Sequence, residues 1–279
     1  MWVGQQLADG LDFWGFLGSL ILGGIILGIY TGLLGYVGAK TGLSLDLLSQ
    51  RAFGEKGSYL PSAMTSFTQI GWFSVGSFVS GGTATPNFAR FAKNGKSGAI
   101  TTVVAFFIGN SLMFFFGAVS SIFVGGNDIF EVMVRLNLFY LAVLVLGLNI
   151  WTTNDNALYT AGLGLANIFH QRKKPMVLLS GIIGTVASVW LYYNFCGWLN
   201  ILNCTLPPVG MILVLAYFMN KKDFETDQPK LKTVDWFAVA GVILGAIVAN
   251  ILHWGIASIN GMVVAAVCYC VGQAVNKRK

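Results

Sequence analysis

The amino-acid sequence predicts an all-α polytopic membrane protein. Of its 279 residues, 55% are hydrophobic and only 10% are charged, whereas soluble domains carry about 25% charged residues. The charges are also clustered. Long charge-free stretches lie between the clusters, and each exceeds the ~20 apolar residues that a helix needs to cross the hydrocarbon core. These stretches are 13–39, 97–127, 175–220 and 236–276.

The positive charges gather on one predicted side of the membrane. They lie in the segments 40–56, 90–96, 172–174, 221–232 and 277–279. Of the 17 Lys and Arg residues, Arg135 alone falls on the other side. The positive-inside rule assigns such basic loops, and with them the C-terminus, to the cytoplasm. The net charge of +6 therefore indicates topology rather than a nucleic-acid partner.

The predicted crossings follow one another with short loops between them. In chain order they are 13–39, 97–123, 137–169, 175–194, 198–220, 236–253 and 256–274. We expect a short amphipathic stretch within 40–56, an outer loop at 127–135, and a break in 198–220 at Pro207 and Pro208. Gly24, Gly28 and Gly32 share one helix face, which predicts close approach of a second helix.

The segment 58–89 does not fit this alternation. Basic clusters flank it on both sides, so an even number of crossings must lie between them. Two membrane helices need about 40 residues, and this run is shorter. We therefore expect that a piece of the fold is missing within the run.

Polar residues concentrate in the middle of one span, in LGLNIWTTNDNALY at 146–159. Asn149, Thr152 and Thr153 share one helix face because they are three and four residues apart. Their oxygen atoms suit a hard cation such as sodium. The alternative is that the threonine hydroxyls bond to backbone carbonyls one turn earlier.

Asp155 is the one acidic residue inside a predicted span. A buried membrane Asp costs roughly 2.5–3.5 kcal/mol on insertion scales, so it indicates a function by default. It could carry a proton, lie near a bound cation, or serve as a structural partner of a helix end or basic residue.

A second polar concentration is TQIGWFSVGSFVSGGTATPNFA at 68–89. Gln69 and Trp72 are three residues apart, and Ser77, Phe78 and Ser80 precede Gly81-Gly82. Glycine pairs favour an interrupted helix whose backbone can face a ligand. Two aromatic rings with amide and hydroxyl groups suit a flat polar heterocycle. The alternative is that both rings are ordinary packing residues.

The sequence carries no HExxH, GxSxG, P-loop or CxxC pattern. An enzyme is therefore not expected, nor is a cofactor beyond a coupling ion. The sequence also gives no sign of an obligatory protein partner, so the expected partners are a small molecule, an ion and the lipid bilayer.

Several segments resemble the bacterial cytosine permeases of the nucleobase–cation symporter-1 family. They are TQIGWF (68–73), SFVSGGTATPNFARF (77–91), GNSLMFFFGA (109–118), LGLNIWTTNDNALY (146–159) and LPPVG (206–210). The similarity covers essentially the whole chain as a single transporter domain, 1–279. It implies twelve helices in a five-plus-five inverted repeat, with helices one and six discontinuous.

The resemblance also implies where the missing piece lies. Phe73 would belong to helix three and Ser74 to helix six. Most of helix three and helices four and five would be absent between them, and part of helix one would precede Met1.

Roles follow residue by residue from the resemblance. Trp72 and Phe78 would sandwich a cytosine ring, and Gln69 and Asn154 would bond to its edge, with Ser77 and Ser80 nearby. Asn149, Thr152 and Thr153 would hold sodium against helix-one carbonyls.

The implied activity is sodium-coupled import of cytosine across the bacterial inner membrane by alternating access, in pyrimidine salvage. Two other functions remain open. One is a proton-coupled transporter of a related purine, pyrimidine, hydantoin or vitamin, with Asp155 as the titrating group. The other is a membrane receptor that binds its ligand without transport.

Overall fold

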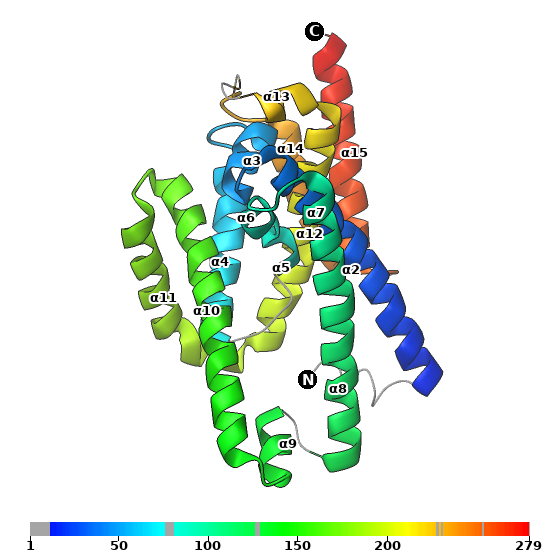
Figure 1. Cartoon of the computed structure of the whole chain (residues 1–279). Helices are drawn as coiled ribbons and strands as arrows, with labels where there is room; N and C mark the ends of the chain where they lie inside the picture. Colours follow the sequence, from blue (N-terminus) through cyan, green and yellow to red (C-terminus); the bar gives the residue numbers. More distant parts are fainter. Residues whose placement is uncertain are drawn as a thin grey trace.

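The computed structural model describes residues 12–75, 81–125, 129–226, 229, 231–252 and 254–278. Within these residues every regular element is a helix, and the long helices run between two ends of the molecule (Figure 1). Five of the described helical stretches are long and apolar enough to cross a membrane. The prediction of an all-α polytopic membrane protein is confirmed.

The helices follow the predicted order. The first are α2 (Phe13–Thr41), α3 (Leu45–Phe53), α4 (Tyr59–Val75), α5 (Gly81–Ala84) and α6 (Pro86–Ala89). The next form one long rod, α7 (Gly95–Val104), the π-helix η1 (Ala105–Gly109) and α8 (Asn110–Val124), followed by α9 (Ile129–Arg135). The last are α10 (Phe139–Phe169), α11 (Lys173–Tyr193), α12 (Phe195–Met219), α13 (Lys221–Glu225), α14 (Trp236–Ile251) and α15 (Ala257–Arg278).

The basic segments meet at one end of the molecule, which we call the basic end. The short helices α3, α6 and α13 lie there, at the top of Figure 1, as does the end of α15. Arg135 lies at the opposite end in α9, where it pairs with Glu131 at 2.6 Å. Segments 40–56 and 90–96 thus share an end, as the charge pattern predicted.

Local signals explain where the first helices begin and end. The Asp12 side chain caps α2 by accepting from the Gly15 amide at 3.1 Å, and Ser44 caps α3 in the same manner. Gly42, at φ 68°, ends α2 in the left-handed region, which glycine adopts without a steric penalty. The amphipathic helix predicted within 40–56 is α3.

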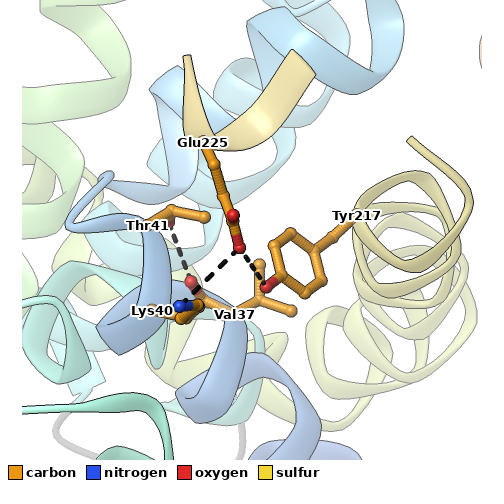
Figure 2. A network of polar contacts seen from close by, with 5 residues as sticks. All are labelled: Val37, Lys40, Thr41, Tyr217 and Glu225. Atoms are coloured by element: carbon orange, nitrogen blue, oxygen red, sulfur yellow. Dashed lines mark hydrogen bonds and ion pairs between the residues drawn. The ribbon is translucent and has the colours of Figure 1, made fainter. Parts of the chain in front are cut away.

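The core lies between α12 and its neighbours. Leu34, Val37 and Leu48 pack with Ile212 and Tyr217 in one buried cluster that joins α2, α3 and α12. At the basic end, Glu225 accepts a hydrogen bond from Tyr217 at 3.1 Å and lies 4.0 Å from the Lys40 ammonium (Figure 2). The Lys40 and Glu225 side chains are 48% and 42% exposed, so their ion pair stabilises little. The packing of the buried Tyr217 ring against Phe224 therefore contributes more to the stability of this end than the ion pair does.

The predicted break at Pro207 and Pro208 is wrong, because α12 continues through both residues. Neighbouring helices accommodate the prolines. A Cβ added to Gly245 or to Gly261 would lie 3.2 or 3.1 Å from the Pro208 ring, so α14 and α15 approach it through glycines. Membrane helices tolerate proline where neighbours and local adjustments compensate for the lost hydrogen bond.

The predicted glycine ridge on α2 is confirmed. Helix α7 packs along it, and η1 continues the contact. A Cβ on Gly24 would lie 2.9 Å from the Phe107 ring, and one on Gly32 would lie 2.6 Å from Val103. The closest approach is at Gly35, where a Cβ would meet the Thr102 hydroxyl and lie 3.1 Å from the Gly98 carbonyl oxygen.

We expect Gly35→Ala to destabilise the protein, because the added methyl meets the Thr102 hydroxyl, which is buried and hydrogen-bonded to the Gly98 carbonyl at 2.7 Å. Overpacking of this kind costs about 1–3 kcal/mol. Gly23→Ala is the matched control, since nothing lies within 4 Å of a Cβ there. Thermal unfolding in detergent should show a lower midpoint for Gly35→Ala than for the wild type. The midpoint of Gly23→Ala should not be lowered. Equal midpoints would contradict the close approach of α2 and α7.

Candidate functional site

The candidate site lies along the contact between α4 and α10. The chain leaves the basic end through α4 and returns to it through α10, so the two helices are antiparallel (Figure 1). On α4, Ser62, Ser66 and Gln69 share one face because they lie at i, i+4 and i+7. All three are buried. They form a buried polar stripe along α4.

Small residues on α10 receive this stripe. Ser66 donates a hydrogen bond to the Ala161 carbonyl at 3.1 Å. A Cβ on Gly164 would meet the Ser66 hydroxyl and lie 2.8 Å from the Ser62 carbonyl. Asn167 donates to the Ser62 hydroxyl at 2.8 Å. The helices are therefore in backbone-close contact, and their register is fixed.

This register locates the predicted ligand residues relative to one another. Ser62 lies level with Asn167, and Ser66 with the turn of Ala161 and Gly164. Each turn toward the C-terminus of α4 lies opposite a turn nearer the N-terminus of α10. Continued by two turns, the same register brings Asn154 level with residues 72–75.

The two predicted amides therefore lie on facing helices, with Gln69 about one turn before the level of Asn154. Gln69 is buried and Asn154 is half-buried. The Asn154 Oδ1 atom is inaccessible to solvent and has no hydrogen-bond partner among the described residues. A buried acceptor without a partner costs about 1–3 kcal/mol, so this oxygen is well suited to a ligand donor.

The aromatic pair cannot be assessed in the same way. Trp72 lies on α4, one turn after Gln69, but its side chain is outside the described part of the structure. Ser77, Phe78 and Ser80 also lie outside the described residues. Their roles remain predictions.

The three predicted sodium ligands lie on α10, and two of them are exposed. Asn149 and Thr152 are exposed and Thr153 is half-buried. The Thr152 hydroxyl donates to the carbonyls of Leu148 at 3.2 Å and Asn149 at 3.1 Å. This is the backbone bonding that the sequence left open as an alternative. The hydroxyl oxygen keeps lone pairs for a cation, because it acts as a donor in both bonds.

Helix α2 does not lie along this face. The helices that pack along α10 in the described structure are α3, α4, α9 and α11. The expected meeting of α10 with helix-one carbonyls is thus not formed by the residues that the structure describes. Asp155 is also exposed on α10 and forms no ion pair with the residues that the structure describes.

A buried polar cluster that was not predicted from the sequence lies at the basic end of the contact between α4 and α10. Asn167 donates to Ser58 and Ser62 at 3.1 and 2.8 Å and accepts from Gln50 at 2.6 Å. The amide thereby joins α3, α4 and α10 and uses both its donors. The available signal was the serine spacing on α4, read in register with small residues on α10.

Asp46 extends this cluster. Its Oδ1 accepts from the Ser62 hydroxyl at 2.6 Å, while its Oδ2 has no hydrogen-bond partner among the described residues. Burial raises the pKa of Asp46 to about 6, although the Ser62 hydroxyl and the positive charge of Arg90 act in the opposite direction. Ionisation of Asp46 therefore lowers the stability of the folded protein.

Comparisons with known proteins agree with this architecture. The family model of permeases for cytosine/purines, uracil, thiamine and allantoin matches residues 1–83 and 74–275. The chain belongs to this family. It is 36% identical to the cytosine permeases of Escherichia coli K12 and of Escherichia coli O157:H7, over 100% of this chain and 88% of each relative. It is therefore a multi-pass membrane transporter of the permease type and not an enzyme.

A solved transporter shares the fold. The structure of Mhp1, a nucleobase-cation-symport-1 family transporter in a closed conformation with bromovinylhydantoin bound, matches with a TM-score of 0.77. The match covers 97% of this chain and 87% of Mhp1 at 14% identity. The predicted transporter fold is confirmed.

We expect Asp46→Asn to remove a pH dependence of stability. The folded pKa of about 6 exceeds the unfolded value of ~3.9, so the native state holds more protons than the unfolded state between these values. Unfolding free energy then falls as pH rises from about 4 to 6, by at most ~3 kcal/mol. The wild-type unfolding midpoint should drop from pH 5 to pH 7.5 by more than that of Asp46→Asn.

Asp223→Asn is the control for this measurement, because Asp223 is exposed at the same end of the molecule. It should keep the wild-type difference between the two pH values. An Asp46→Asn protein with the full wild-type drop would show that the buried carboxylate is not its source.

Proposed function

We propose that this chain imports cytosine across the bacterial inner membrane, coupled to sodium and by alternating access, with its basic end and C-terminus in the cytoplasm. The observation that carries the proposal is the Asn154 Oδ1 atom, which is buried on α10 without a hydrogen-bond partner among the described residues, at the level where α4 ends beyond Gln69. Two amides supply both donors and acceptors. Cytosine presents both along one edge of a flat ring.

The comparisons support the substrate class. The relatives are named cytosine permeases, and the solved neighbour holds bromovinylhydantoin, another flat heterocycle with polar edges. In our proposal, the rings of Trp72 and Phe78 cover the two faces of the base. Ser77 and Ser80 lie beside it.

The proposed coupling ion is bound by Asn149, Thr152 and Thr153. Three oxygen-bearing side chains on one α10 stripe form half of a hard-cation site. One sodium ion moving inward across ~100 mV contributes about 2.3 kcal/mol, and a tenfold sodium gradient adds about 1.4 kcal/mol. Together they support accumulation of a neutral base by a few hundredfold.

The other half of the site comes, in our proposal, from backbone carbonyls of helix one of the family. We also propose that an internal part of the family fold, distinct from that half-site, is missing from this chain. The alignment with the relatives extends over 372 residues, against 279 in the chain. The family model matches in two stretches that overlap at residues 74–83. Both findings support a junction between Phe73 and Ser74, where helix three of the family would pass directly into helix six.

Cytosine binding should depend on Gln69 and on Thr152. We expect Gln69→Ala to weaken binding about 10- to 100-fold, because an edge hydrogen bond in a buried site is lost. Thr152→Ala should raise the sodium concentration at half-maximal binding. Thr185→Ala is the matched control, since its exposed hydroxyl also bonds to its own helix, at Gly181. Isothermal titration of cytosine with and without sodium measures these effects.

Uptake assays separate the competing functions. Cells without their own cytosine permease should gain sodium-dependent cytosine uptake from this chain, or from this chain with the relative's segment inserted between Phe73 and Ser74. Uptake that follows pH and persists without sodium would instead favour proton coupling through Asp155. Binding with no counterflow in proteoliposomes would favour a receptor.

A further inference from the structure

The segment 81–92 is held in place by its side chains. It follows directly after the predicted ligand residues of 76–80, and it contains the helices α5 and α6, of four residues each. Helices this short have no stability of their own in isolation. Contacts with other elements must therefore determine where the segment lies.

Three of these contacts join the segment to α2 and α3. Thr83 and the Tyr30 hydroxyl on α2 form a hydrogen bond of 2.8 Å. Pro86 lies against Gly38, where a Cβ would come within 2.7 Å of the proline Cα. The buried Asn87 accepts from the Leu45 amide at 2.8 Å, which satisfies one of the free amides at the start of α3.

The fourth contact joins the segment to α10. The Arg90 guanidinium donates a hydrogen bond to the Tyr159 hydroxyl. The Tyr159 ring is itself held by the Lys173 ammonium at 3.5 Å from its centroid, a cation–π contact at the start of α11. Bonds to charged groups contribute about 1.5–3 kcal/mol, more than a neutral pair. This is the one described contact of the segment that uses a charged donor.

Arg90 also acts on α3. Its positive charge acts on the buried carboxylate of Asp46, one residue beyond the Leu45 amide that Asn87 binds. Neither the Arg90 Nε nor the Asp46 Oδ2 atom has a hydrogen-bond partner among the residues described. The guanidinium thus bonds to α10 directly, while the Asn87 bond to the Leu45 amide joins the same segment to α3.

We propose that Arg90 and Tyr159 form a latch at the basic end, which holds segment 81–92 against α3 and α10 and releases when the site opens toward that end. Arg90 is a positioning residue in this scheme, because it does not touch the proposed ligand. The inference rests on the proposed transport function, since a carrier must open its midplane site to each side in turn. Its test requires no ligand.

Ser49 provides a reporter for the latch. It lies on α3, one turn beyond Asp46, and its side chain is fully buried. In a Ser49→Cys background, the rate of alkylation by N-ethylmaleimide at position 49 measures how often this buried side of α3 becomes accessible. Peptide mass spectrometry resolves this site from the native cysteines. Native Cys204, buried on α12, reports general loosening in the same sample.

Arg90→Gln and Tyr159→Phe should each raise the alkylation rate at position 49 about tenfold, and the double variant no further, because both remove one bond. The rate at Cys204 should not change. Lys93→Gln, an exposed positive charge three residues on, should leave both rates unchanged. Unchanged rates at position 49, equal rises at both sites, or effects that multiply in the double variant would each overturn the latch.

Hydrogen exchange provides a second measurement that avoids the reporter substitution. Peptides covering 45–53 should exchange faster in Arg90→Gln and Tyr159→Phe than in Lys93→Gln, and equal exchange would overturn the latch. Cytosine with sodium should slow both readouts if the proposed function is correct. A latch effect without a ligand effect would count against that function alone, and the reverse would count against the latch alone.

Discussion

The close contact of α4 with α10 is the constraint on which the candidate site depends. A backbone approach of this kind requires small residues, and Gly164 has no space for a side chain opposite Ser62 and Ser66. Because the two helices cannot slide without losing the Asn167 and Ser66 hydrogen bonds, the register set at the basic end extends to mid-span. The contacts of Ala161 and Gly164, about two turns from Asn154, thus determine which residues of α4 lie level with Asn154.

The basic end combines two kinds of contact with different consequences. The glycine contact of α2 with α7 is steric, and a close-packed interface of this type has no alternative arrangement of similar energy. The contacts of segment 81–92 are individual polar bonds, which can be exchanged for bonds to water or to other groups at modest net cost. The rigid glycine contact of α2 with α7 and the exchangeable polar bonds of segment 81–92 are therefore neighbours at the basic end.

Much of this fold could be predicted from the sequence, because membrane spans and charge asymmetry are direct physical signals. The glycine ridge of α2, the amphipathic α3 and the side of each basic segment follow from such signals. The continuity of α12 through Pro208 could not be predicted, since it depends on glycines of α14 and α15 that lie far away in sequence. The π-helix at 105–109 carried no local signal either. In the site, the sequence indicates Gln69 and Asn154 as candidate ligands, and their role stays a prediction, whereas the Asn167 cluster requires knowledge of helix register.

The exposed and the buried polar groups of α10 require different explanations. Asn167 is fully hydrogen-bonded inside the protein, so its polarity serves the packing of three helices. Asn149 and Thr152 are exposed, and no helix in the described part of the chain packs over that face in the manner of α4. Polar residues inside membrane spans face either the interior of the helix bundle or a water-filled cavity. The exposed stripe of α10 therefore differs in kind from the Asn167 cluster, because its polar atoms are free to bind a solute or an ion, whereas those of Asn167 are used in packing.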